Sequence, residues 1–128
     1  MITLYYASIN SSDIYAIKWL ERHGMEVNKK IMRQLSKKDL LKVLSLTENG
    51  FSDILKRPSK TNRKTQKAID KVENMSFKEG INFILGNSDI LRSPIIIEKD
   101  KLVIGYNVEE MRVFLSKDYR SVERLGQI

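Results

Sequence analysis

The chain of 128 residues and 14.9 kDa suits one domain, and two independent cores are hard to fit into it. Its composition, 41% hydrophobic and 30% charged, excludes disordered and fibrous proteins, and no apolar run approaches the ~20 residues of a membrane span. Lys and Arg number 23 against 16 Asp and Glu, and this net charge of +7 indicates an anionic partner.

The first elements predict a β-α-β unit. Residues 2–6 are β-branched or aromatic and indicate a strand, and residues 25–31 alternate between apolar and polar as a second strand does. Between these strands, Ser11 or Ser12 is expected to cap a helix, and Gly24 is expected to end it. The segment lacks the basic region of a secretory signal, so export is not expected.

A block of helices is predicted over residues 36–86. Ser36 begins a pattern that resembles a capping box, and Asn49-Gly50 is expected to end the helix that it caps. A short helix follows, and Pro58 breaks it because proline lacks the backbone donor that a helix needs.

Two longer helices complete the block. The helix at 61–72 has few apolar residues and must be largely exposed, whereas Ser76 and Glu79 form a capping box for a helix that Gly86 ends. The chain then returns to strands at 94–97 and 102–104, before Asn107 caps a last helix at 108–115.

This order of elements predicts an α/β fold, a thioredoxin-like mixed sheet with a helical insertion between its β-α-β and β-β-α halves. We expect a single domain over residues 1–128. Residues 1–31 and 90–117 form its central β/α core, 36–86 form the helical insertion, and 118–128 form a flexible tail.

The positive charge is concentrated in two segments. Residues 56–71 hold seven basic residues against one acid, and residues 29–42 hold six against one. Such segments suggest contact with a polyanion, most simply nucleic acid, and the alternative is a solvated lysine-rich helix face. Because their spacing matches no base-reading pattern, we expect salt-sensitive phosphate contacts rather than sequence readout.

The chain contains no cysteine, which excludes disulfides, thiolate metal sites and thiol nucleophiles and is compatible with a reducing cytoplasm. The single histidine, His23, is expected at the end of a helix, where a basic group suits the helix dipole. With one histidine and no thiol, neither a transition-metal site nor a cofactor is expected.

Five short motifs follow one another along the chain in an order and spacing that are typical of one protein family. They are Leu46-Thr47-Glu48-Asn49-Gly50, Ser59-Lys60, Leu91-Arg92-Ser93-Pro94-Ile95-Ile96-Ile97, Gly105-Tyr106-Asn107 and Arg112-x-Phe114-Leu115. In these motifs the chain resembles the Spx-type regulators, relatives of the arsenate reductases within the thioredoxin-like superfamily. The resemblance runs nearly from end to end, with a gap of about two residues before Ser36.

The chain departs from this family at its redox motif. Asn10 and Asp13 stand where the family has the two cysteines of a C-x-x-C motif. Neither residue forms a thiolate, so arsenate reduction and thiol-disulfide sensing are both excluded. Both residues suit a helix N-terminus as structural groups, and a sharper hypothesis is that Asp13 supplies a permanent charge where the family switches.

The family's anion pocket is also altered. Ser93 replaces the arginine that in the family directly precedes the proline, and Arg92 matches the family arginine one position earlier. Pro58 replaces another family arginine, and Arg57 lies beside it. The chain therefore lacks arginines that the family's oxyanion site uses. Pro94 resembles the structural cis-proline of thioredoxin-like folds.

The resemblance implies a non-enzymatic transcription regulator that binds the C-terminal domain of the RNA polymerase α subunit and alters promoter use. It places the polymerase contact around Gly50, with Tyr5 nearby, and it matches Lys60 and Arg92 to positions near promoter DNA. From charge alone, we extend the DNA contact to a further set of basic residues in the insertion: Arg57, Arg63, Lys64 and Lys67.

We expect a cytoplasmic protein of the stress response that is a monomer when free and insensitive to thiol oxidants. Two alternatives remain open. One is a degenerate arsenate-reductase-like or thiol-transfer protein, and the other is a redox-blind decoy that competes with active relatives for polymerase.

Overall fold

The computed structural model describes residues 1–7 and 11–116. Asn10 and the tail predicted at 118–128 lie outside the described residues.

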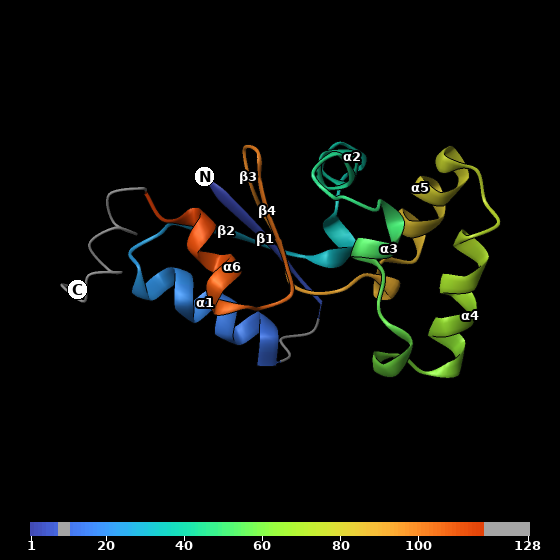
Figure 1. Cartoon of the computed structure of the whole chain (residues 1–128), viewed down its shortest axis with the longest axis horizontal. Coiled ribbons are helices and arrows are strands. Elements are labelled where there is room, and N and C mark those ends of the chain that lie inside the picture. Colours follow the sequence, from blue (N-terminus) through green and yellow to red (C-terminus); the bar gives the residue numbers. More distant parts are fainter. Residues whose placement is uncertain (8–10, 117–128) are drawn as a thin grey trace.

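A four-stranded mixed sheet forms the centre of the molecule (Figure 1). Its strands are β1 (Ile2–Tyr6), β2 (Val27–Ile31), β3 (Ile95–Glu98) and β4 (Lys101–Ile104), and they lie in the order β2-β1-β3-β4. β1 pairs parallel to β2 and antiparallel to β3, and β3 pairs antiparallel to β4. The predicted mixed α/β fold is therefore confirmed.

Helices cover both faces of this sheet. On one face lie α1 (Ser11–Arg22) and α6 (Val108–Met111), which continues into a 3-10 turn at Arg112–Phe114. Leu4 and Ile96 point to this side and pack with Trp19 of α1, whereas their neighbours along the strands point to the other side. A strand directs alternate side chains to opposite faces, so each central strand serves two apolar clusters.

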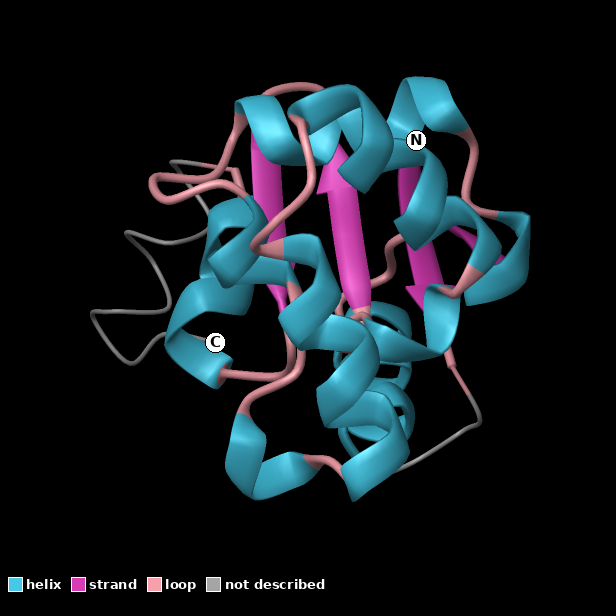
Figure 2. Ribbon diagram, turned by 90° about the vertical axis from the view of Figure 1, so that its right-hand side faces the viewer, coloured by secondary structure: helices cyan, strands magenta, loops and turns pink. Residues whose placement is uncertain are grey.

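The other face is covered by the insertion, defined here as residues 32–94 between β2 and β3. Figure 2 shows its helices in front of the strands. They are α2 (Lys37–Ser45), α3 (Phe51–Ile54), α4 (Arg63–Val72) and α5 (Phe77–Gly86), with 3-10 turns at Met32–Gln34, Pro58–Lys60 and Ser88–Ile90. Fully buried residues such as Leu40, Ile54 and Ile84 join Tyr5 and Ile95 of the sheet in one cluster.

Three predicted helix starts are confirmed. The Oγ of Ser36 accepts a hydrogen bond from the backbone N–H of Asp39, and Ser76 and Glu79 form a reciprocal capping box. The side chain of Asn107 accepts from the N–H of Glu110 at 3.1 Å. Each cap satisfies a backbone donor that the first turn of a helix leaves unpaired.

Several predicted boundaries are wrong, and two of them bear on how the site is formed. Strand β2 begins at Val27 rather than at residue 25, because the N–H of Met25 still donates to the carbonyl of Leu20 at the end of α1. Helix α2 ends at Ser45 rather than at Asn49-Gly50, and Gly50 instead precedes α3 as its N-cap.

A side-chain hydrogen bond ties the sheet to the insertion. The hydroxyl of Tyr5 on β1 donates to Oδ2 of Asp39 on α2, two residues separated by 34 positions. Burial first, and then the contact with Asp39, raise the pKa of Tyr5 well above its usual value. The phenol therefore remains protonated at neutral pH and acts as a donor.

Candidate functional site

The segment between α2 and α3 forms a loop around Gly50 that several hydrogen bonds hold together. The carboxylate of Asp53 accepts hydrogen bonds from the backbone N–H groups of Glu48 and Asn49, at 3.1 and 3.0 Å. Gly50 has φ 69° and ψ −131°, a conformation that a residue with a Cβ adopts only with strain. A Cβ built on Gly50 meets nothing within 4 Å, so the loop faces open space there.

Hydrogen bonding explains the electrostatics of this loop. Donors from Asn49, first from its backbone and then from its side chain, stabilise the charged carboxylate and lower the pKa of Asp53. Asp53 therefore stays ionised and keeps the loop in one shape.

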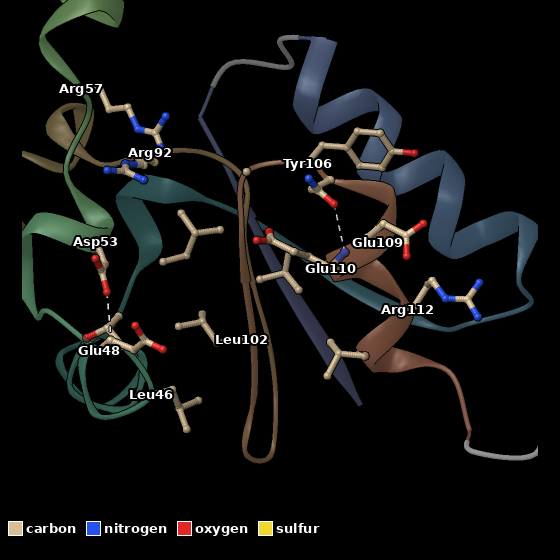
Figure 3. Close-up of a pocket in the computed structure, with 16 residues that line it drawn as sticks. Leu46, Glu48, Asp53, Arg57, Arg92, Leu102, Tyr106, Glu109, Glu110 and Arg112 are labelled. Atoms are coloured by element: carbon tan, nitrogen blue, oxygen red, sulfur yellow. Dashed lines mark hydrogen bonds between the residues drawn. The ribbon is translucent and has the colours of Figure 1, made fainter. Parts of the chain in front are cut away.

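Beside this loop lies a groove of about 950 Å³ between the insertion and the β4–α6 edge (Figure 3). Glu48 and Asp53 line its insertion side, and Glu109 and Glu110 of α6 line the opposite side. Apolar side chains lie between these acidic walls, among them Leu102 of β4. The groove is therefore mainly polar, with carboxylates on both sides and a narrower apolar strip between them.

Two arginines close one end of the groove. The Nε of Arg92 donates to the carbonyl of Leu55 at 2.6 Å, and its Nη2 donates to the carbonyl of Ser52 at 3.0 Å. Partial burial, followed by the positive charge of Arg57, lowers the pKa of Arg92, and Asp53 opposes this in part. Arg92 therefore holds the end of α3, while the exposed Arg57 lies beside it (Figure 3).

Helix α4 presents a basic face to solvent. Its basic residues Arg63, Lys64, Lys67 and Lys71 are all exposed, whereas Ile69 and Val72 are buried. Asn62 caps the helix, and its Oδ1 accepts from the N–H of Thr65 at 2.8 Å. The side chain of Lys60 lies outside what the structure describes. The structure brings Arg63, Lys64 and Lys67 together on one helix, with Arg57 on the segment that leads to it.

The structure places Tyr5 and Asp13 inside the molecule. Both residues are fully buried, Tyr5 in the insertion-side cluster and Asp13 in the first turn of α1. The burial of Tyr5 argues against the direct partner contact predicted for it, because its hydroxyl is engaged by Asp39 and its ring has no exposed surface. The peptide bond between Ser93 and Pro94 is cis.

The sequence interpretation missed three groups that shape the site. Asp53 orders the Gly50 loop, Asp39 reaches Tyr5, and Tyr106 lines the groove near the arginines. Asp53 was open to prediction, since an aspartate beside a turn commonly accepts hydrogen bonds from nearby backbone N–H groups. The contact of Asp39 with Tyr5 had no such local signal.

Residues 1–7 and 11–116 show neither a metal-binding cluster nor a membrane-spanning helix. Within them, no group of three or more His, Asp or Glu side chains is placed to hold a metal ion. His23 stacks on Trp19 and donates from Nδ1 to its carbonyl at 2.7 Å, as expected of a residue that ends a helix. No helix in the described part is long and apolar enough to cross a bilayer.

Comparison with known proteins gives consistent matches. A family model described as the ArsC family matches residues 11–114. A protein named global transcriptional regulator Spx from Streptococcus mutans is 40% identical over 125 residues, which are 96% of this chain and 89% of that protein. The Spx of Streptococcus pyogenes serotype M1 is 38% identical, with 96% and 91% covered.

Solved structures agree on the fold. A putative ArsC family related protein from Bacteroides fragilis superposes with a TM-score of 0.73 at 18% identity, over 88% of this chain and 95% of that one. An arsenate reductase from Vibrio cholerae gives a TM-score of 0.74 at 13% identity, over 89% and 97%. These likenesses confirm the predicted thioredoxin-like architecture with its helical insertion.

Proposed function

Since the chain belongs to the ArsC family, we propose that it is a transcription regulator that binds the C-terminal domain of the RNA polymerase α subunit and alters promoter use without redox switching. The observation that carries this proposal is the 40% identity, over 96% of the chain, to a relative named as a global transcriptional regulator. It acts without enzymatic chemistry, because no cysteine is available at the position where the family places its thiols.

The docking surface is the Gly50 loop together with the adjoining groove. Gly50 leaves open space at the surface, and the Asp53 hydrogen bonds keep the loop in a fixed shape before any partner arrives. A preorganised loop loses little conformational entropy on binding. The carboxylates on both sides of the groove, with the narrower apolar strip between them, suit a partner helix that combines basic residues with a short apolar stripe.

Promoter DNA is contacted, in the same complex, by the basic residues of the insertion. Arg63, Lys64 and Lys67 are exposed on α4, at positions that share one side of a helix. Arg57 precedes them, and Lys60 extends the set in sequence. Arg92 lies at the edge of this surface and contributes mainly its charge, because two of its donors hold α3.

The docking surface is tested with two substitutions of one glycine. Gly50→Arg projects a long cationic side chain from the loop, and we expect it to abolish binding to the purified α C-terminal domain in calorimetry. Gly50→Ala imposes the same backbone strain with a side chain that contacts nothing, and we expect it to retain most of the binding. A folded Gly50→Arg variant that binds normally would refute this docking surface.

The DNA contact is tested by salt dependence. Replacing Arg63, Lys64 and Lys67 with glutamine should weaken promoter binding by the polymerase complex and reduce its salt slope by about 3. Binding to the isolated α domain should not change, because Gly50 and the groove are intact. Transcription with purified polymerase then distinguishes an activator from a decoy, since a decoy occupies polymerase and leaves promoter output unstimulated.

A further inference from the structure

A second cavity, of about 380 Å³, opens between α3 and α4 on the insertion. We propose that it binds a small carboxylic acid with an apolar body, an aromatic ring or a branched chain. The cavity shares Arg57 and Arg92 with the groove and with the DNA surface proposed above, and its test therefore uses a small-molecule probe that neither of those proposals requires.

The inner part of the cavity is apolar. Leu55 of the α3 side and Ile69 and Val72 of α4 line it, each less than a tenth exposed. Phe51 closes one side, and its ring stacks on the exposed Phe77 with ring centroids 5.5 Å apart. A cavity of this volume lies within the range that small-molecule sites occupy, and it accepts a body of about 10 to 15 non-hydrogen atoms.

The rim of the cavity is cationic. Lys56, Arg57 and Arg92 line it, against a single carboxylate from Glu73. In the part of the chain that the structure describes, no acidic side chain forms a salt bridge with Lys56 or Arg57. The rim therefore carries an excess of positive charge beside an apolar interior.

The rim is also held in place. The guanidinium of Arg92 is fixed by its two bonds to α3 carbonyls, and the backbone N–H of Lys56 donates to the carbonyl of Ile90 at 3.0 Å. Burial first, and then the positive charge of Arg57, lower the pKa of Arg92, and an anion placed between the two arginines relieves the part that is due to Arg57. An apolar acid satisfies both halves of the site, since its body displaces water from the interior and its carboxylate pairs with the rim.

The probe for this site is 2-naphthylacetate, with the neutral 2-naphthylacetamide as its matched control. We expect the acid to bind the intact protein in calorimetry, to shift the backbone amide resonances of α3 and α4, and to bind at least about tenfold more tightly than the amide, the equivalent of one charge-assisted hydrogen bond. Equal binding of acid and amide, or amide shifts confined to other elements, would overturn the proposal.

Two double variants with the same change of charge complete the test. Lys56→Gln with Arg57→Gln removes the rim, and we expect it to weaken the acid about tenfold. Arg63→Gln with Lys64→Gln removes two exposed charges of α4 that do not line the cavity, and we expect it to leave affinity for the acid within twofold. Equal losses in the two variants indicate general charge attraction and overturn the site. Because Arg57 also lines the groove beside Gly50, polymerase binding by these variants is measured separately and does not decide this test.

Discussion

The insertion packs against the sheet of the central β/α core but differs from that core in charge. Residues 32–94 contain 13 Lys and Arg against 7 Asp and Glu, whereas the rest of the chain contains 10 against 9. The core is therefore nearly neutral, and almost all of the net charge of +7 belongs to the insertion. In this chain the sheet and α1 form the nearly neutral part, and the insertion carries the charged surface to which the partner contacts are assigned in the proposal above.

The two regions are nevertheless joined mechanically. Tyr5 packs in the insertion-side cluster while its neighbour Leu4 packs against α1, and both belong to the same strand. Because each central strand serves both clusters, we expect the protein to unfold as one unit.

The strongest test of that unity removes buried volume from one side at a time. Ile84→Ala in the insertion and Leu20→Ala in α1 each delete a fully buried side chain, and each should lower the free energy of unfolding by about 2–5 kcal/mol. In either variant, Trp19 fluorescence and far-ultraviolet circular dichroism should give the same denaturation midpoint. If the two probes give different midpoints for Ile84→Ala, the insertion unfolds separately from the core. The two regions would then be independent folding units.

A second substitution concerns only the insertion. A Cβ at Gly80 of α5 lies 2.8 Å from the ring of Phe51, so Gly80→Ala forces that ring to move and should cost about 1–3 kcal/mol. Gly86→Ala is the matched control, since a Cβ there meets nothing within 4 Å and alanine favours a helix. Equal stability of the two variants in chemical denaturation would show that the Phe51 ring moves aside without a measurable cost in stability.

The bond between the regions is removed by Tyr5→Phe. Loss of the hydrogen bond to Asp39 should cost about 1–2 kcal/mol at neutral pH. Because the pKa of Tyr5 is raised on folding, its contribution should be complete below the ordinary tyrosine pKa of about 10 and decline as the pH rises above it. Tyr15→Phe, at an exposed tyrosine, is the control and should change the free energy of unfolding little at neutral pH. A loss in Tyr5→Phe that does not diminish at alkaline pH contradicts this assignment.

The smallest effect is a local titration in the Gly50 loop. Since hydrogen bonds from Asn49 and Glu48 lower the pKa of Asp53, their amide resonances should titrate with a midpoint below the ordinary aspartate value of about 3.9. The bonds stabilise the fold above that value and are lost as the pH falls through the depressed pKa. Asp53→Asn should abolish the titration, and an unshifted midpoint would mean that the loop is not preorganised.

Local signals predicted most of the fold. Caps at Ser36, Ser76 and Asn107 lie within three residues of the donors that they satisfy, so the sequence alone is sufficient to locate them. The end of α2 was mispredicted because Asn49-Gly50 is a common helix stop, and here the more distant carboxylate of Asp53 organises the loop instead.

The site was harder to predict because its contacts cross the chain. Arg92 donates to the carbonyls of Ser52 and Leu55, which are 40 and 37 residues away, whereas the family resemblance suggested only a DNA contact for it. Tyr5 was expected near a partner surface, yet alternation along β1 turned its ring into the insertion-side cluster. Such outcomes depend on which elements pack together, and no local pattern encodes them.

The run Ile95-Ile96-Ile97 has a consequence for how β3 finds its place. Its side chains alternate between the two apolar clusters, and all three are chemically identical. A slip by one position would exchange their faces and still leave both clusters apolar, so these residues alone do not reject a misaligned strand. The correct alignment is selected by the ends of β3, where the carbonyl of Pro94 accepts from Gly105 at 2.8 Å and Glu98 lies opposite Lys101.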